Sequence, residues 1–308
     1  MTHAHVVERV HARAPGKINI YLSVGGREDD GYHEVASAYQ AVSLYEDVWA
    51  SAADEFSVSV TGSVNVRDVP LDESNLAVRA ARLLASEIGW AGGVHLDVHK
   101  DVPVAGGMGG GSADAAAALV ACDALWGAGL SSLELQRLAA RLGADVPFAL
   151  MGGTAIGVGR GDRLTPALAP ARLEWVLVIS EHGLSTPVVY SRLDERRESK
   201  GVVIPPGYRP SVDPRLLQAL RAGELRRIAD LTRNDLGEPA ILERIELDEI
   251  MDLGRQDALT AFVSGSGPTV VFLVDDESAA LELQVTLSAA GHTALHVHGP
   301  VPGARIVP

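Results

Sequence analysis

Residues 103–119 read PVAGGMGGGSADAAAAL, and five of the six residues from Gly106 to Gly111 are glycine. Such a run is compatible with a flexible linker, a nucleotide-binding loop or a tight packing corner. The segment VHLDVHK before it alternates like a strand, and SADAAAALVACDALW after it reads as a helix with Ser112 as the expected N-cap. A linker would have polar neighbours, so that alternative is disfavoured. Strand, glycine loop and helix direct backbone N–H groups and the helix dipole at an anion, which favours phosphate binding, although a packing corner stays open.

The spacing of the glycines separates this loop from two common phosphate-binding loops. The dinucleotide loop G-x-G-x-x-G fits no register, since Ser112 and Asp114 stand where the last glycine would be. The Walker A loop G-x-x-x-x-G-K-[ST] matches at Gly106 and Gly111, but Ser112 stands in place of its lysine. Positive charge must therefore come from elsewhere in the chain. Lysine occurs only at positions 17, 100 and 200.

Length and charge limit the classes of protein to consider. The 308 residues suffice for two domains, which we place at residues 1–164 and 165–308. The net charge of −14 argues against a nucleic-acid partner but leaves small phosphorylated ligands open. The single cysteine, Cys122, cannot form an internal disulfide and is expected on a buried helical face. We find no membrane span or signal-peptide core, so a cytoplasmic protein without a membrane partner is expected.

Hydrophobic periodicity predicts a mixture of strands and helices. Alternation predicts strands at VSLYEDVWA, FSVSV, VHLDVHK, EWVLVIS, LTAFVS, VVFLV and ALHVHG. Helical spacing predicts helices at NLAVRAARLLASEI, SSLELQRLAARL, DPRLLQAL, ELRRIADL, LDEIMDL and SAALELQVTLSAA. The second of these has a capping box at Ser131 and Glu134 and ends at Gly143. The alternation indicates an α+β fold with helices on one face of a sheet, and ESKGVVIPPGYRPSVDP reads as an exposed loop.

Three ordered segments resemble the motifs of one family, the GHMP kinases. They are APGKINIYL near the start, PVAGGMGGGSA in the middle and VSGSGPTVVFL near the end. The resemblance implies a two-domain GHMP kinase fold. Its N-terminal, ATP-binding domain would resemble domain 2 of ribosomal protein S5, and its C-terminal domain a ferredoxin-like α/β sandwich. It also implies an ATP-dependent kinase, with Mg²⁺ delivered by the nucleotide because no carboxylate cluster with metal-ligand spacing is evident.

Four further segments are similar to the members of this family that phosphorylate 4-diphosphocytidyl-2-C-methyl-D-erythritol: GREDDGYHEV, NLAVRAA, LGADVPFAL and STPVVY. The resemblance implies that the γ-phosphoryl group of ATP passes to the 2-hydroxyl group of this cytidine diphosphate-linked methylerythritol, in the non-mevalonate isoprenoid pathway. A homoserine or mevalonate-type kinase is the first alternative. A catalytically silent nucleotide-binding relative is the second, although it should have lost its base or its lysine. Oligomeric state, binding order and domain movement carry no signal in the sequence.

The resemblance assigns the catalytic roles to two residues. Asp145 in GADVPF would be the general base, and Lys17 in APGKINIYL would lie beside it, orienting the acceptor hydroxyl and countering the developing charge. Each residue has a structural alternative. Asp145 could end a helix in a turn, and Lys17 could be a surface turn lysine. Lysine is scarce in this chain, which weighs against the second alternative.

The resemblance also implies two sets of binding residues. The substrate set, in which Tyr32 stacks on cytosine and His33 bonds its edge, is Asn19, Tyr32, His33, Thr186, Tyr190, Gly265, Ser266 and Gly267. The ATP set is Asn75, Pro103, Val104, Ala105, Gly106, Gly107, Met108, Gly109, Gly110, Gly111 and Ser112, with Ser112 near Mg²⁺. Structural alternatives remain open: a hairpin aromatic for Tyr32, core packing for Tyr190 and a helix N-cap for Asn75. Asp114 would repel phosphate, so we expect it to point away or to touch Mg²⁺.

Overall fold

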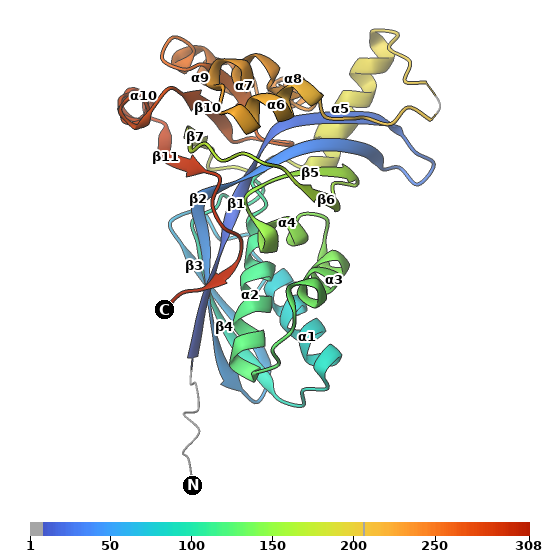
Figure 1. Cartoon of the computed structure of the whole chain (residues 1–308), viewed down its shortest axis with the longest axis vertical. Coiled ribbons are helices and arrows are strands. Elements are labelled where there is room, and N and C mark those ends of the chain that lie inside the picture. The colour runs from blue at the N-terminus through green and yellow to red at the C-terminus, as the bar shows by residue number, and fades with distance from the viewer. Residues whose placement is uncertain (1–8, 206) are drawn as a thin grey trace.

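The computed structural model describes residues 9–205 and 207–308, which form two sheets with helices packed on them (Figure 1). The first sheet has eight strands in the order β12-β1-β2-β4-β3, with β5 pairing β2 and β6, and β8 pairing β1. These strands are β1 (Arg9–Arg27), β2 (His33–Ala53), β3 (Phe56–Gly62), β4 (Gly93–Lys100), β5 (Thr154–Gly159), β6 (Arg163–Pro166), β8 (Arg233–Asn234) and β12 (Arg305–Ile306).

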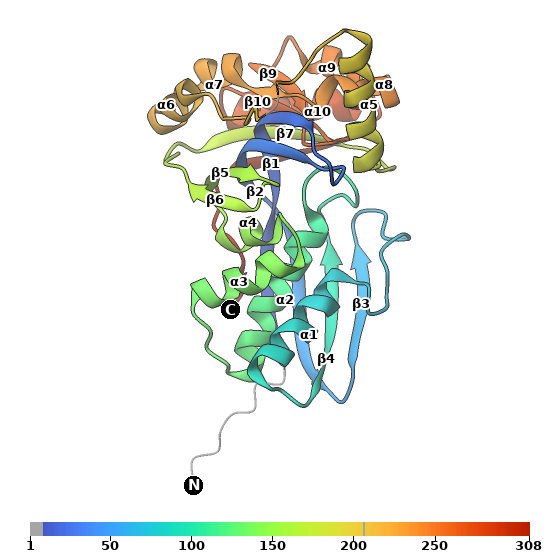
Figure 2. The ribbon, with the colours of Figure 1, turned by 90° about the vertical axis from the view of Figure 1, so that its right-hand side faces the viewer.

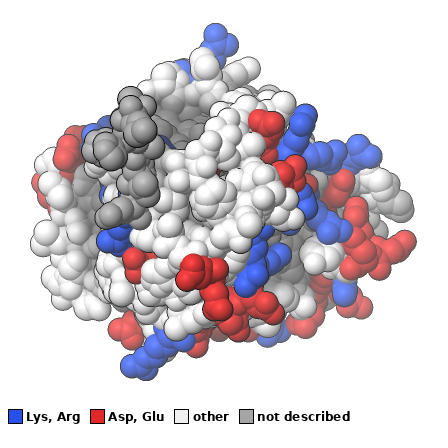
Figure 3. Space-filling model, turned by 90° about the horizontal axis from the view of Figure 1, so that it is seen from below, with Lys and Arg blue, Asp and Glu red and all other residues white. Residues whose placement is uncertain are grey.

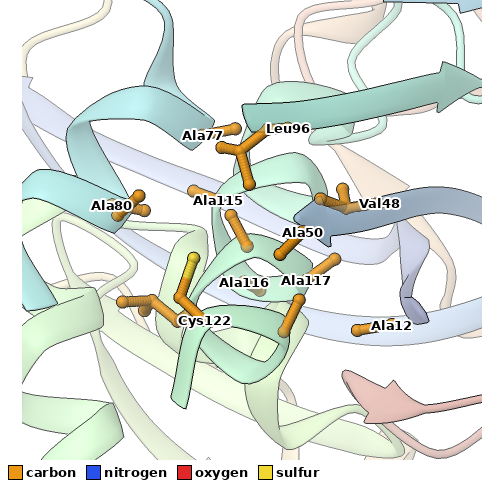
Figure 4. Close-up of a cluster of buried hydrophobic side chains, with 14 of the residues drawn as sticks. Ala12, Val48, Ala50, Ala77, Ala80, Leu96, Ala115, Ala116, Ala117 and Cys122 are labelled. Atoms are coloured by element: carbon orange, nitrogen blue, oxygen red, sulfur yellow. The ribbon is translucent and has the colours of Figure 1, made fainter. Parts of the chain in front are cut away.

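Four helices accompany the first sheet, of which the first two pack against its strands and the other two pack against the second helix (Figure 2). They are α1 (Leu76–Ile88), α2 (Gly110–Trp126), α3 (Ser132–Leu142) and α4 (Val146–Met151). Helix α2 lies closest to the sheet because alanines face it. Ala115, Ala116 and Ala117 are fully buried beside Val48 and Leu96 (Figure 4). Small side chains let the helix backbone approach the strands closely.

The second sheet is antiparallel throughout, in the order β11-β7-β10-β9. Its strands are β7 (Leu173–Ile179), β9 (Thr260–Val263), β10 (Val270–Val274) and β11 (Thr293–Gly299). Six helices accompany it: α5 (Thr186–Ser199), α6 (Pro214–Ala222), α7 (Leu225–Leu231), α8 (Gly237–Glu243), α9 (Glu246–Gly254) and α10 (Glu277–Ala289). The predicted α+β class is confirmed, and the division at residue 164 stays a prediction.

Two long strands connect the sheets. Ile18 and Ile20 of β1 share a buried cluster with Trp175 and Leu177 of β7. Successive strand residues face opposite sides, so Val176 belongs instead to the cluster formed with α5, α9 and α10. The first sheet thus runs under the second, and the segments resembling the kinase motifs meet where they join.

Of the four helix ends inferred from the sequence, three are found in the structure and one is not. The side chain of Asn75 caps α1, the Ser131–Glu134 capping box begins α3, and Gly143 ends it. The prediction that Ser112 caps α2 is wrong. The helix begins at Gly110, and its N-cap is Gly109 with φ of 72°. Because glycine alone adopts this left-handed conformation at little cost, the helix starts earlier than the serine suggests.

Candidate functional site

A cavity of about 490 Å³ lies where β1, the glycine loop and α5 meet. The segments that line it are far apart in the chain but include all three motifs. The lining residues from the sequence-based sets are Lys17, Asn19, Pro103, Ala105, Gly106, Gly107, Gly109, Gly110, Gly111, Ser112, Asp145, Thr186, Tyr190, Gly265 and Ser266. Met108 does not line it, because its side chain is fully buried in the core between the sheets.

Lys17 lies at the centre of the hydrogen bonds in this cavity. Its Nζ donates to Asn19 Oδ1 at 2.6 Å and to the carbonyl oxygen of Gly107 at 3.0 Å, and lies 3.9 Å from Asp145 Oδ2. Asn19 in turn donates to the Ser37 hydroxyl at 2.7 Å, which fixes its orientation. Burial lowers the pKa of Lys17 below its ordinary value, and the nearby Asp145 carboxylate opposes that shift. Lys17 is therefore a buried, oriented cation rather than a surface turn residue.

Asp145 follows α3 and occupies the N-cap position of α4. Its side chain makes no capping hydrogen bond, although aspartate at an N-cap usually does. The carboxylate lies instead in the cavity opposite Lys17, and the side chain is about one-third exposed. Beneath them, Tyr39 lies with its ring centroid 5.7 Å from Lys17 Nζ. Burial, and secondarily the Asp145 charge, raise the pKa of Tyr39 well above its usual value, so Tyr39 stays neutral beside the ion pair.

The glycine loop brings backbone groups close to both side chains. A Cβ atom added at Gly109 would lie 3.4 Å from Lys17 Cγ and 3.8 Å from Asp145 Oδ2. Gly107 has φ of 76°, and a Cβ there would lie 2.1 Å from the Ser264 carbonyl oxygen. The loop therefore needs glycine for close approach as well as for its backbone angles. The first turn of α2, Gly110 to Ser112, lines the cavity, so its unpaired N–H groups can bind an anion there.

The start of the glycine loop also borders a second cavity, of about 550 Å³. Pro103 lines both cavities, whereas Val104 lines only the second. Asn65 and Arg67 form part of its other wall. The loop thus stands between two adjoining spaces, one holding Lys17 and Asp145 and one beyond them.

The third motif packs directly on the glycine loop. The Ser264 hydroxyl donates to the Gly107 carbonyl oxygen at 3.2 Å. Gly265 has φ of 56°, and a Cβ there would lie 3.1 Å from Asn19 Oδ1. Gly267, with φ of 74°, does not line the first cavity and instead completes the turn. Ser266 bonds Thr186 across the cavity at 2.9 Å between hydroxyl oxygens.

Asn234 holds this turn and was not found from the sequence. Its Nδ2 donates to the carbonyl oxygens of Val263 at 2.6 Å and Gly265 at 2.7 Å. Its Oδ1 accepts from the Leu236 backbone N–H, so the whole side chain is engaged. An isolated asparagine in RNDL carries no signal that it would reach a turn some thirty residues later, at residues 263–265.

The two residues expected to bind cytosine lie beside the cavity rather than on its wall. Tyr32 follows a turn and is 59% exposed, with the guanidinium of Arg160 4.2 Å from its ring centroid. His33 is buried, bonds Asp194 and lies against Tyr190, with 5.1 Å between ring centroids. Tyr190 and Arg160 do line the cavity. Burial, and then the Asp145 charge, raise the pKa of Tyr190 to about 12.

Asn75 and Asp114 are both engaged away from the first cavity. The Asn75 side chain accepts from the Ala77 N–H and donates to the Pro70 carbonyl oxygen, so local backbone uses its amide. Asp114 is buried and accepts from Lys100 Nζ at 2.6 Å, and that ammonium also bonds Glu46 at 2.8 Å. Burial is the main cause that raises the pKa of Asp114 and, more strongly, of Glu46. Asp114 therefore points away from the phosphate loop, as one of the two expectations had it.

Over residues 9–205 and 207–308, no three histidine, cysteine or acidic side chains cluster closely enough to hold a metal ion. Within the same residues, no helix is long and apolar enough to cross a membrane. The face in Figure 3 carries acidic and basic side chains intermingled, with uncharged surface between them. Ser112 lines the wall of the first cavity.

Comparison with known proteins agrees with this arrangement. The GHMP kinases N terminal domain matches residues 75–153, and the GHMP kinases C terminal domain matches residues 216–293. A 4-diphosphocytidyl-2-C-methyl-D-erythritol kinase from Clavibacter michiganensis subsp. michiganensis is 58% identical over 300 residues, 97% of this chain and 96% of that protein. A relative from Leifsonia xyli subsp. xyli with the same name is 57% identical over 98% of this chain and 99% of its own.

Two solved structures have the same structural similarity to this chain but differ in sequence identity. The crystal structure of a 4-(cytidine 5'-diphospho)-2C-methyl-D-erythritol kinase superposes with a TM-score of 0.74 at 31% identity, covering 94% of this chain and 98% of that one. The homoserine kinase from Cytophaga hutchinsonii reaches the same TM-score at 16% identity and therefore shows the fold alone. Sequence identity decides between them. The chain belongs to the 4-diphosphocytidyl-2-C-methyl-D-erythritol kinase family, ATP-dependent phosphotransferases of the GHMP kinase superfamily.

Proposed function

We propose that this chain transfers the γ-phosphoryl group of ATP to the 2-hydroxyl group of 4-diphosphocytidyl-2-C-methyl-D-erythritol, giving the 2-phosphate and ADP in the non-mevalonate isoprenoid pathway. One observation carries the proposal most. The Lys17 ammonium lies 3.9 Å from the Asp145 carboxylate and 3.0 Å from the Gly107 carbonyl oxygen, inside one cavity. A cation, a carboxylate and a phosphate loop are thus combined where an acceptor hydroxyl can meet a phosphoryl group.

The two catalytic residues would have different roles in the transfer. Asp145 would take the proton of the 2-hydroxyl group while the oxygen of that hydroxyl group bonds to the γ-phosphorus. The bond between this phosphorus and the ADP oxygen breaks in the same step. Lys17 positions the hydroxyl and stabilises the charge on the moving phosphoryl group. Its third N–H group is free for this, because Asn19 and Gly107 use the other two. Positioning and charge stabilisation account for most of the rate enhancement in phosphoryl transfer.

The ATP phosphates would lie along the glycine loop from Gly106 to Ser112, against the N-terminus of α2. Ser112 lines that space and would face a Mg²⁺ ion delivered with ATP, which would neutralise phosphate charge there. The second cavity, beside Pro103 and Val104, has room for the nucleoside. Because the amide oxygen and the amide nitrogen of Asn75 are both already bonded, we assign Asn75 to holding the start of α1, whose Leu76 lines the first cavity, rather than to a direct bond with adenine.

The substrate would lie between β1 and α5. Asn19, Thr186 and the Gly265–Gly267 turn would surround its methylerythritol end, since each is close to Lys17 or bonded across the cavity. Tyr32 would stack on the cytosine through its exposed face, and His33 would bond the base edge, with Tyr190 packed behind it. We further propose a cytoplasmic enzyme of two domains, residues 1–164 and 165–308, with neither nucleic acid nor a membrane as partner.

The first test is ADP release with ATP and Mg²⁺, offering the cytidylated methylerythritol, homoserine and mevalonate in parallel. We expect turnover of the cytidylated substrate alone, with phosphate on its 2-hydroxyl group. Turnover of homoserine or mevalonate would keep the phosphate-loop argument and overturn the substrate assignment. No turnover of any of the three would overturn the kinase assignment itself.

A further inference from the structure

His33, the first residue of β2, makes a contact with α5 that the proposed mechanism does not use. Its side chain is only 4% exposed. Its Nε2 atom lies 2.8 Å from Asp194 Oδ1, and its ring packs on Tyr190. Two residues of one helix thus hold a histidine that comes from the opposite side of the substrate cavity.

The spacing along α5 explains why these contacts coincide. Thr186, Tyr190 and Asp194 are four residues apart, so their side chains lie on one face of the helix. Thr186 and Tyr190 line the cavity, and Asp194 lies one turn beyond it. Val189 and Leu193 are buried in the core and fix the rotation of the helix about its axis. The same face of α5 therefore meets the substrate and orients His33.

The Asp194 carboxylate determines where a neutral His33 carries its proton. An ionised carboxylate only accepts hydrogen bonds, so Nε2 must be the protonated nitrogen. The second nitrogen, Nδ1, then has a lone pair and can only accept. Among the described residues, Nδ1 makes no hydrogen bond within the protein. His33 is thus held as an oriented acceptor.

We propose that Asp194 is a positioning residue for base selection, which acts by holding His33 as a hydrogen-bond acceptor at Nδ1. This inference rests on the proposed function, in which His33 meets the base edge. Cytosine carries an exocyclic amino group, which donates to such an acceptor. Uracil has a carbonyl oxygen at that position, and two facing acceptors repel each other. A site built for one hydrogen bond rejects a ligand that leaves its polar groups unpaired.

The test compares the dissociation constants of CDP and UDP, measured by titration calorimetry on the full chain. Unmodified protein is expected to bind CDP at least about tenfold more tightly than UDP, a difference of about 1.4 kcal/mol, because UDP would leave one polar contact unmade. Asp194→Ala should bring the two constants within about threefold of each other. In Asp194→Asn the new amide can donate to Nε2 and favour the proton on Nδ1, so that UDP gains relative to CDP.

Glu195→Gln is the matched control, because it removes one negative charge from the same helix at an exposed position that touches Arg192 and not His33. The control should keep the full preference for CDP. All variants should bind ATP as the unmodified protein does and give its circular dichroism spectrum. Asp194→Asn is nearly isosteric, so it keeps the test valid even if the alanine variant folds poorly.

Three outcomes would overturn the inference. The unmodified protein could bind CDP and UDP equally, the Asp194 variants could keep the preference, or both ligands could weaken by the same factor. The last result would mean that Asp194 only braces Tyr190 and His33. Failure of the proposed function has a different signature, namely no turnover of the cytidylated substrate and no CDP binding by the unmodified protein.

Discussion

The Lys17 ammonium has three N–H groups, and two of them are used within the protein, by Asn19 and Gly107. The third group is the one that can meet a phosphoryl oxygen or the acceptor hydroxyl. Because the 3.9 Å separation between Lys17 Nζ and Asp145 Oδ2 is longer than a hydrogen bond, the two charges attract without closing the space between them. A reacting group can therefore enter, and the residues keep their charges for the reaction.

Asp145→Asn tests the proposed base. The amide keeps the size of the side chain but cannot take a proton, so kcat for ADP release should fall by about 10²–10⁴-fold. KM for ATP should change little, because Asp145 is not part of the glycine loop. Asp54→Asn, on an exposed turn, is the control and should keep full activity. A kcat for Asp145→Asn equal to that of the unmodified protein would rule out Asp145 as the base.

The lowered pKa of Lys17 predicts a loss of activity at alkaline pH. Lys17 acts as a cation, so kcat should fall as pH rises through its pKa, which burial places below the ordinary 10.5. The midpoint of the loss should therefore lie below pH 10.5 in a profile of kcat against pH, with unfolding monitored separately by fluorescence. A profile flat to pH 10.5 would mean that the charge of Lys17 is not needed.

Single residues could be predicted where a motif fixes both their type and their position. Lys17, Asn19 and Asp145 stand in segments that resemble the family, and the structure brings them to one cavity. Tyr39 and Asn234 were missed, since their contacts depend on strands and turns that meet only in the folded chain. The Ser112 cap was wrong because local preference favours serine, whereas the tertiary structure uses the backbone freedom of Gly109.

At the scale of elements, the glycine loop offers a matched pair of substitutions. Gly107→Ala should destabilise the protein by about 1–3 kcal/mol, because its Cβ would clash with the Ser264 carbonyl oxygen at a left-handed backbone angle. Gly111→Ala has no atom within 4 Å of the added Cβ and lies in a helix, so the fold should be kept or slightly stabilised. Urea unfolding measures the difference.

The same pair separates stability from phosphate binding. Because Gly111 lines the cavity, the methyl group of Gly111→Ala would occupy space beside the first turn of α2, so KM for ATP should rise several-fold in a stable protein. An unchanged KM would mean that the phosphates do not approach that turn. A Gly107→Ala variant as stable as the unmodified protein would show that the loop can move away from Ser264.

A buried charge cluster fastens α2 to the first sheet. Lys100 of β4 bonds Glu46 of β2 and Asp114 of α2, and all three side chains are buried. Lys100→Met would leave two carboxylates without their cation, which should cost about 3–5 kcal/mol in urea unfolding at neutral pH. Lys200→Met, at an exposed lysine, should cost much less. Equal effects of the two variants would mean that the cluster contributes nothing specific.

The sign of the pH dependence provides a second check on this cluster. Burial raises the pKa values of Glu46 and Asp114 above their ordinary values of 4.5 and 3.8. A carboxyl group with a raised pKa in the folded state contributes stability at low pH, and this is lost as pH rises through that pKa. The deficit of Lys100→Met should therefore shrink as pH falls toward 4.5. A deficit in unfolding free energy that does not change with pH would mean that Lys100→Met destabilises the protein through lost packing rather than lost charge.

Elements with a strong period could be predicted, whereas elements with a weak period were missed, whether short or long. The helices α1 and α3 follow from apolar spacing and caps, as found. The helix α5 has 14 residues and contains the segment STPVVY, but it was missed because its apolar residues follow no clear helical period. The strand β8 has only two residues and therefore no period to detect. Its pairing with Tyr21 and Leu22 depends on the surrounding fold.

At the scale of the molecule, the C-terminal segment shows why the sheet that each strand joins could not be predicted from the sequence. Strand β11 stays in the second sheet, whereas β12 returns to pair with β1 at Ala12 and Arg13, as Figure 1 shows near the C-terminus. Strand β11 mixes apolar residues with two histidines and β12 consists only of Arg305 and Ile306, and nothing in their composition states which edge is free. That edge exists only after β1 and β2 have paired, so the choice is a property of the assembled sheet.

The shared cavity predicts the kinetic mechanism. Lys17, Asp145, the glycine loop and the substrate side of α5 line one space, so both substrates can be bound together and the phosphoryl group can pass directly between them. Initial-rate plots against both substrates should give intersecting lines. The protein should also catalyse no exchange of labelled ADP into ATP when the acceptor is absent. Parallel lines, or exchange without acceptor, would indicate a phosphorylated enzyme with Asp145 as the nucleophile. The carboxylate would then not act as a base.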